Sequence, residues 1–446
     1  MSAGAAGAMI ITATATAQTT YAPPQSAYAQ VAEAAQQRKK NNNSAGTNSC
    51  LTFSKAVRLA ALTDPAISTR QARLSQAEAD VQEAKSLFRP QISAFARTGV
   101  GDVGLIDSAI QNQAGLSVSQ RILDFGDAKL AKRAARYSVD ASEYDIQQAE
   151  LAAGVDASAA MLDMLQAQEA MAFTGDRRQY FQDQLDAVEA LLEGGGATVS
   201  ERAEVAAQLA SAQTFFLDLQ SQFEQAETRL TIDIDQTPVI CTAPILEAEF
   251  KTLGDELGSI DVAVNKAVYQ APELRALSAR ADSLDAQSKR EKRARLPVIS
   301  VVGSAAYSSI GSSDNFGIQE RVGLDVSVPI FSGKALGARS KRARGRQAEA
   351  RSELAERKRQ LEEDVRIAYR RIASLEAQLI TGQNFEDRSR ELFEFAEFEY
   401  NAGTRTLPDL VEIRLEYEQA GLSKLRLKYQ LLREKLRLYS LTGTLS

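Results

Sequence analysis

The sequence predicts a mainly α-helical protein with a small β part, in which one unit of long coiled-coil helices plus a β-hairpin occurs twice. Three observations predict it. The residues Ala, Gln, Glu, Arg, Leu and Lys dominate the 446-residue chain, a composition typical of long helices. Landmark residues recur at one spacing, and two very long segments contain no proline.

The recurring landmarks indicate a tandem duplication. Pro65 and Pro272 lie 207 residues apart, as do Pro90 and Pro297. Self-similarity at a fixed period indicates repeated structural units. We therefore expect a first repeat at residues 51–240, a linker at 241–258 and a second repeat at 259–446. Other pairs share nearly the same offset: Gly195 with Gly403, Glu201 with Asp409, and Glu204 with Glu412.

Residues 1–49 differ from the rest and predict a signal-like, low-complexity, disordered N-terminus. Ala15-Thr16-Ala17 and Ala27-Tyr28-Ala29 have the small residues of a signal cleavage site, although no basic region precedes them. We interpret this segment as an export signal followed by a disordered stretch.

Each repeat begins with a helical segment and continues into two strands. The helical segments, at 52–86 and 260–294, are interrupted early by a proline. Alternating apolar and polar residues then predict strands of about ten residues, long enough to cross a bilayer when tilted. An ordinary half-buried sheet is the alternative. The expected strands are 91–101, 114–122, 298–309 and 322–330, joined by polar loops at 102–112 and 309–317.

Two proline-free runs, 127–192 and 335–400, decide the architecture. Each has 66 residues and would reach roughly 100 Å as a helix, far more than a globular core needs. A two-stranded coiled coil is the alternative, but neither run keeps a strict heptad of large apolar residues. Each run ends in a glycine turn, and a return helix of about 33 residues is expected after it.

Composition excludes several functions. The chain has no His and two Cys, so it offers little for a metal site or general-base catalysis. We expect no cofactor, no metal and no enzymatic activity. The formal charge of −6 argues against a nucleic-acid partner. No stretch of about 20 apolar residues predicts a transmembrane helix, so a membrane could be crossed only by strands, whose open edges exclude a monomer.

The order of elements resembles the TolC-like outer-membrane factor family over about residues 51–446. The most specific match is Tyr400-Asn401-Ala402-Gly403-Thr404-Arg405-Thr406-Leu407-Pro408-Asp409-Leu410, with the final Leu441-Thr442-Gly443-Thr444-Leu445. The resemblance implies a homotrimer whose helices form a tunnel and whose strands form a shared 12-stranded transmembrane β-barrel. It also implies an outer-membrane protein that extends into the periplasm.

The function implied by the resemblance is the exit duct of a tripartite efflux pump or of a type I secretion system. The implied partners are a periplasmic adaptor (membrane fusion protein), an inner-membrane pump or ABC transporter, and the lipid bilayer. The alternative is a periplasmic coiled-coil adaptor or structural protein. Drugs, metals and secreted proteins all stay open as cargo.

The helix tips carry the candidate site. Acidic pairs at both tips begin the return helices, where the dipole favours anions, so plain helix-start acids are one interpretation. The resemblance implies instead that Asp409, Glu412 and Glu204 line the pore as acidic rings. It further implies an entrance gate in which Tyr400 and Arg405 meet Ser200 and Glu201 on a neighbouring coil.

The two cysteines allow either one disulfide or two unpaired thiols. Cys50 precedes the first repeat and Cys241 lies between the two. In an oxidising compartment a Cys50–Cys241 bond would tie the N-terminal segment to the inter-repeat linker.

Overall fold

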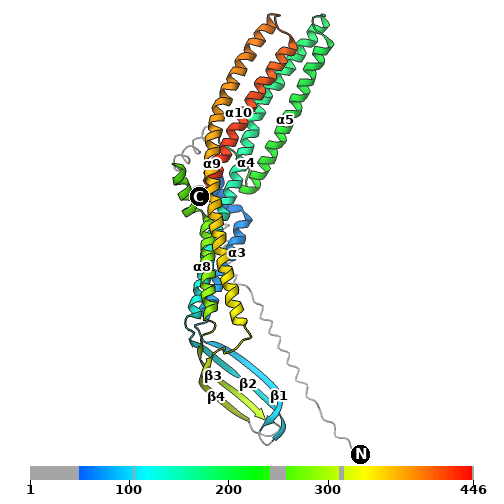
Figure 1. Cartoon of the computed structure of the whole chain (residues 1–446). Coiled ribbons are helices and arrows are strands. Elements are labelled where there is room, and N and C mark those ends of the chain that lie inside the picture. The colour runs from blue at the N-terminus through cyan, green and yellow to red at the C-terminus, as the bar shows by residue number, and fades with distance from the viewer. Residues whose placement is uncertain (1–49, 104–105, 242–257, 311–315, 444–446) are drawn as a thin grey trace, which may run out of the picture. The chain divides into compact units, whose positions relative to one another are not determined.

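The computed structural model describes residues 50–103, 106–241, 258–310 and 316–443 (Figure 1). The chain divides into two units, Met1–Cys50 and Leu51–Ser446. All the helices and strands named below belong to the second unit. The expectation of a disordered, signal-like N-terminus falls on residues outside the described ranges.

The two repeats contain the same elements in the same order. Corresponding helices are equal in length, at 11, 22, 67 and 36 residues, which confirms the predicted duplication. The first repeat contains α2 (Phe53–Thr63), α3 (Pro65–Ser86), β1 (Gln91–Val103), β2 (Ile106–Leu123), α4 (Asp127–Glu193) and α5 (Val199–Ile234). The second contains α7 (Ile260–Gln270), α8 (Pro272–Arg293), β3 (Val298–Ile310), β4 (Phe316–Ser327), α9 (Ala335–Asn401) and α10 (Leu407–Thr442).

Local sequence explains where these helices begin and end. Pro65 and Pro272 are the first residues of α3 and α8, where a missing N–H costs nothing. At the tips, Gly195 and Gly403 have φ of 72° and 74°, a conformation that glycine adopts without steric cost. The two long helices therefore turn back on α5 and α10 as the glycine turns predict.

The four strands form one antiparallel sheet in the order β1-β2-β3-β4. Register places Ile92, Val118, Gly303 and Val322 in one row across the sheet, and Ser93, Ser117, Ser304 and Arg321 in the adjacent row. Because adjacent residues of a strand point to opposite faces, one face is apolar and the other polar. The described unit leaves the apolar face uncovered, as the exposed fractions of Ile92 (74%) and Val322 (84%) show.

The predicted strand bounds were wrong in two places. Residues 102–112 were expected to be a loop, but β1 runs to Val103 and β2 begins at Ile106. In the second repeat β4 begins at Phe316 and ends at Ser327, before the Pro329 that had been included in the strand. Continuous pairing of backbone groups across the hairpins extends the strands through polar residues, and proline cannot donate to that ladder.

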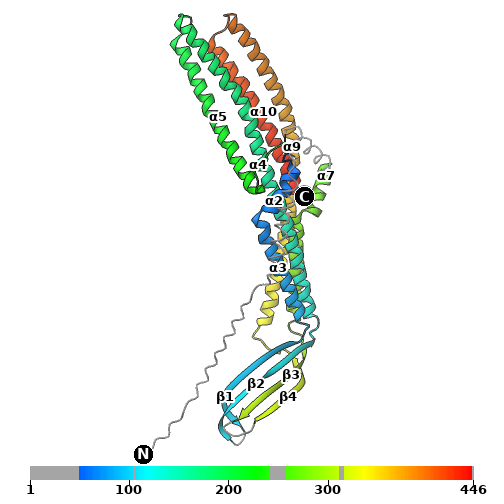
Figure 2. The same ribbon diagram turned by 180° about the vertical axis from the view of Figure 1, so that it is seen from behind.

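The helices next to the sheet pack in the same order as the strands to which they connect. In the chain, α3 precedes β1, α4 follows β2, α8 precedes β3 and α9 follows β4. Next to the sheet, α3 contacts α4, α4 contacts α8, and α8 contacts α9. Farther away, α4 pairs with α5, α9 pairs with α10, and α4 contacts α10 between these two hairpins. The hairpin tips lie at the end of this unit opposite the sheet (Figures 1 and 2). Within the described ranges, no helix is both long enough and apolar enough to cross a membrane.

Candidate functional site at the helix tips

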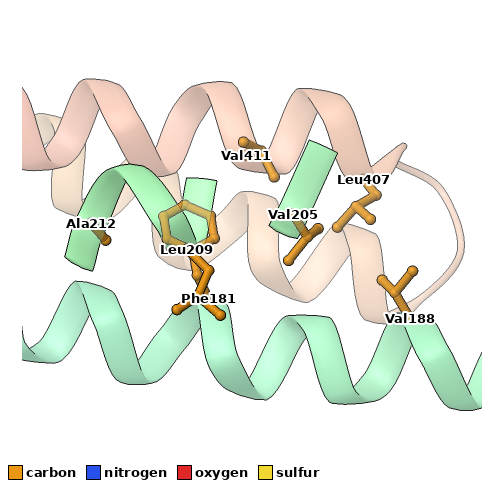
Figure 3. Packing of buried hydrophobic residues seen from close by; sticks show 7 residues of the cluster. All are labelled: Phe181, Val188, Val205, Leu209, Ala212, Leu407 and Val411. Carbon is orange, nitrogen blue, oxygen red and sulfur yellow. The ribbon is translucent and has the colours of Figure 1, made fainter. Parts of the chain in front are cut away.

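A small apolar cluster, the distal core, fixes the two tips against each other. It joins side chains of α4, α5 and α10 (Figure 3). Tyr400, near the end of α9, packs partly buried against it. The α9–α10 tip is therefore seated on the α4–α5 tip by ordinary apolar burial. The distal core consists of Phe181, Val188, Val205, Leu209, Ala212, Leu407 and Val411.

Tyr400 and Glu201 lie within electrostatic reach of each other. Burial raises the pKa of the Tyr400 phenol above its ordinary value, and the negative charge of Glu201 raises that pKa further. Within one chain the structure thus brings together one residue from each tip of the predicted gate.

Glu201 is held in a capping box at the start of α5. Its carboxylate accepts hydrogen bonds from the Thr198 backbone N–H at 2.7 Å and from the Thr198 hydroxyl at 2.8 Å. Both bonds stabilise the ionised form and lower the pKa of Glu201 below its ordinary range. Ser200 is exposed beside it, and Glu204 is half-buried one turn later.

Arg405 pairs within its own tip. Its guanidinium lies 2.7 Å from a carboxylate oxygen of Glu399, and Nε donates to the same oxygen at 2.8 Å. In one chain Arg405 therefore meets Glu399 rather than Ser200 or Glu201. The sequence did not single out Glu399 as a site residue, because it is one of many acids in a charged helix.

The acids of the second tip face solvent. The Thr406 hydroxyl donates to the carboxylate of Asp409 at 2.7 Å, so Asp409 acts as a helix-start acid. Glu412 follows one turn later and is exposed. The Thr406 hydroxyl occupies only one carboxylate oxygen of Asp409. Asp409 can therefore cap the helix and still belong to a ring of acids around the pore.

A buried ion pair behind the tips was not predicted. Glu418 of α10 lies 3.0 Å from Arg177 of α4 and 2.7 Å from Arg414. The three side chains are 3%, 13% and 11% exposed, so both ion pairs are buried. Burial raises the pKa of Glu418 above its usual value, while the two guanidinium groups pull it down.

Aromatic rings enclose Arg414. Its guanidinium carbon lies 4.7 Å from the centre of the Tyr180 ring, 4.9 Å from that of Phe393 and 5.5 Å from that of Tyr417. Ring faces attract cations, and this attraction grows when water is excluded. Burial also raises the pKa of the Tyr180 phenol. We call Arg177, Glu418, Arg414 and these three rings the joint.

Neither cysteine is a free thiol. Cys50 and Cys241 are both disulfide-bonded. Beside them, the Leu51 N–H donates to the Val239 carbonyl at 2.6 Å, and the Cys241 N–H donates to the Leu51 carbonyl at 3.1 Å.

A sheet with an uncovered apolar face, continued by two long helical hairpins whose acid-bearing tips meet at the far end, defines a channel protomer of the outer-membrane type. The chain belongs to the outer membrane efflux protein family, whose model matches residues 56–232 and 263–444. It is thus an outer-membrane efflux channel of tripartite pumps, in a non-enzymatic family whose members extend into the periplasm.

Solved structures of channels share the fold. The CmeC outer membrane channel of Campylobacter jejuni has 17% sequence identity and a TM-score of 0.73, covering 89% of this chain and 89% of that one. The outer membrane protein VceC of Vibrio cholerae has 16% identity and a TM-score of 0.75, covering 88% and 96%. The open-state MtrE channel of Neisseria gonorrhoeae has 17% identity and a TM-score of 0.72, covering 88% and 88%. Among curated proteins, none matched the sequence.

Proposed function

We propose that three copies of this chain assemble into an exit duct that receives its substrate from a periplasmic adaptor and an inner-membrane pump or ABC transporter. The observation that carries the proposal is that the sheet has two unpaired edge strands. Among the described residues, β1 and β4 each have only one partner strand, and α3 and α9 are the outermost helices beside them. Unpaired strand edges do not persist in lipid, so each must meet another copy.

Charge complementarity supports contact between α9 of one copy and α3 of the next. Exposed bases crowd the part of α9 nearest the sheet, and exposed acids the corresponding part of α3. Complementary patches set the register of association and exclude wrong partners. The bases are Lys341, Arg342, Arg344 and Arg346, and the acids are Glu78, Asp80 and Glu83.

The sheet is the part that we assign to the lipid bilayer. Leu116 (57%), Val322 (84%) and Leu324 (72%) stand exposed on its apolar face. Exposed apolar area of this kind marks a surface that another apolar phase covers. When three such sheets are joined edge to edge in the outer membrane, lipid hydrocarbon would cover their apolar faces.

Assembly is tested on the detergent-extracted full chain. Light scattering should give the mass of three copies, and the same preparation should open ion-conducting channels in planar bilayers. A monomer, or recovery of the chain in the soluble periplasm, would contradict the proposal and favour a periplasmic adaptor or structural protein. Crosslinking in cells followed by capture of the channel identifies the adaptor and distinguishes a pump from an ABC transporter.

We also propose that the tips form the entrance gate. In the trimer, Arg405 would leave or share Glu399 to reach Ser200 and Glu201 of the neighbouring coil, with Tyr400 beside them. One exposed pair contributes only about 0–1 kcal/mol, but three symmetric copies together bias the closed state. Asp409, Glu412 and Glu204 would then form acidic rings around the constriction, favouring cations.

The gate is tested with Arg405→Ser combined with Tyr400→Phe. Single-channel conductance should rise, and cells should become sensitive to large antibiotics while trimers still form. Arg202→Ser is the matched control, because Arg202 is an exposed arginine near the other tip whose nearest ion-pair atom, on Glu189, is 3.9 Å away. Wild-type conductance in the double variant would show that Arg405 and Tyr400 do not hold the entrance.

A Cys50–Cys241 disulfide in the mature protein is a further part of the proposal. It is supported by the adjacent backbone pairing of Leu51 with Ile240. Denatured, non-reduced protein should show no free thiol. Two free thiols per chain would contradict the bond.

A further inference from the structure

The helices α4 and α10 meet along a seam that is held by three ion pairs. The sequence numbers rise along α4 as they fall along α10, so the helices run antiparallel. Two of the pairs are partly exposed, and the third, Arg177–Glu418, is buried. The polarity reverses at the buried pair, where the acid lies on α10 instead of α4. The other two pairs are Asp163–Arg433 at 2.7 Å and Glu169–Lys428 at 3.1 Å.

Next to the joint, a ring of α4 fills the space beside a glycine of α10. Gly421 lies one turn after Glu418 on α10 and faces Phe173 of α4. A Cβ added at Gly421 would lie 2.4 Å from Cζ of Phe173, which is closer than non-bonded carbon atoms come. Phe173 is itself held edge-on against Tyr417, with ring centres 5.9 Å apart. Both charge and close packing therefore fix α10 against α4 at this level.

The joint lies behind the tips, although its rings Tyr180, Phe393 and Tyr417 belong to the same apolar cluster as the gate residue Tyr400. Glu418 is 11 residues into α10, and Arg177 is 16 residues before the end of α4. At 1.5 Å per residue, the joint is roughly 20 Å from the glycine turns. It thus anchors the α9–α10 hairpin to α4 on the sheet side of the distal core, which holds the tips themselves together.

The burial of the joint makes it different from the exposed pairs. When Asp163 and Arg433, 35% and 36% exposed, move apart, water replaces the lost contact. When Arg177 and Glu418 separate, Glu418 keeps Arg414 of its own helix, but the Arg177 guanidinium is left without its carboxylate in a dry apolar setting until water enters. Among the three ion pairs of the seam, this one therefore opposes opening most strongly.

We propose that Glu418 is a positioning residue for the entrance, because its pairing with Arg177 sets how readily the α9–α10 hairpin parts from the α4–α5 hairpin. Closure at the tips then depends on the joint as well as on the gate residues and the distal core. The proposal rests on the channel function proposed above and adds residues that the tip does not contain.

Two kinds of variant test the joint without touching the tip. Glu418→Gln removes the charge, and Gly421→Ala pushes α10 away from Phe173 with no change of charge. Each should raise the mean single-channel conductance of the full-length trimer at least twofold. Phe173→Leu added to Gly421→Ala should restore the wild-type value by making room. Asp163→Asn is the control for an exposed pair on the same seam and should leave conductance unchanged.

A double-mutant cycle gives a further test. Arg177→Gln leaves Glu418 with Arg414 alone, and Glu418→Gln leaves both arginines without their carboxylate. Because the two variants remove the same Arg177–Glu418 contact, the double variant should differ from wild type by less than the sum of the two effects. Light scattering and the thermal midpoint, recorded in parallel, separate opening from unfolding. If Glu418→Gln fails to assemble, Gly421→Ala and its Phe173→Leu rescue decide the question.

The outcomes separate this inference from the channel function. Wild-type conductance in assembled Glu418→Gln trimers, or in assembled Gly421→Ala trimers, overturns the role of the joint and leaves the channel in place. Absence of any conductance in the unmodified trimer overturns the channel function itself.

Discussion

At the scale of single residues, the tips show one carboxylate serving two purposes. Glu201 satisfies the start of α5 through Thr198, and its charge also acts on Tyr400 across the distal core. Asp409 combines a cap with exposure in the same way. The functional acids are therefore placed by helix termini, which fix carboxylates more firmly than exposed mid-helix positions do.

Neutralising the exposed acids tests their part in ion selection. Asp409→Asn with Glu412→Gln should reduce cation selectivity and weaken block by trivalent cations, because the acidic ring would lose its negative potential. The reversal potential in a salt gradient measures the first effect. Glu224→Gln, on α5 well away from the tip, is the control. An unchanged reversal potential would place Asp409 and Glu412 on an ordinary solvated face.

The raised pKa of Glu418 predicts a distinctive pH dependence. A folded-state pKa above the ordinary value means that the folded protein binds this proton more tightly than the unfolded chain does. The resulting stability is complete below the ordinary pKa of glutamate and is lost as pH rises through the raised pKa. Thermal midpoints of wild type should therefore fall relative to those of Glu418→Gln across that window. A constant difference between the two proteins would show that Glu418 does not titrate there.

At the scale of elements, the sequence predicted helices better than strands. A proline-free run closed by a glycine turn leaves the chain little alternative, and α4 and α9 match their predicted bounds to one residue. The strands were predicted too short because Asp, Ser, Asn and Gln at 106–113 are typical of loops, yet pairing with β1 and β3 continues through much of this stretch. The joint could not be predicted, because Arg177 and Glu418 are far apart in sequence and lie among many exposed charges.

The sheet contains a glycine pair suited to a direct comparison. A Cβ at Gly115 would lie 2.3 Å from the backbone oxygen of Ala305, whereas nothing lies within 4 Å of a Cβ at Gly323. Gly115→Ala should force β2 and β3 apart and lower the yield of heat-modifiable trimer, and Gly323→Ala should not. Band shifts on unheated and heated gels measure both. Equal yields would show that the strands can separate slightly at no cost.

At the scale of the whole molecule, the two edges of the chain, formed by β1 with α3 and by β4 with α9, are available to pair with other copies. Most residues of α9 are exposed in the single chain, and most of its basic side chains therefore face solvent. Association through charged faces is sensitive to salt because ions screen it beyond about 10 Å at 0.1 M. The assembled channel, and not the single chain, is the stable form that these surfaces indicate.

Lys341→Ala with Arg344→Ala tests the α3–α9 contact between copies. The trimer should dissociate at a lower temperature, and the dependence of its dissociation on salt should weaken. Arg388→Ala is the control, because Arg388 lies on the distal part of α9, is 81% exposed and pairs with Glu391 of the same helix. Identical dissociation curves would exclude these bases from the interface.

The equal lengths of the matched helices restrict how such proteins can evolve. Both 67-residue helices start beside one sheet and their tips meet in one distal core, so deleting one turn from α4 alone would withdraw its tip from its neighbour. Only a simultaneous loss from α5, α9 and α10 would keep the ends level. Insertions and deletions in the hairpins should therefore be inherited as matched sets, and relatives should differ in tunnel length by changing all four helices together.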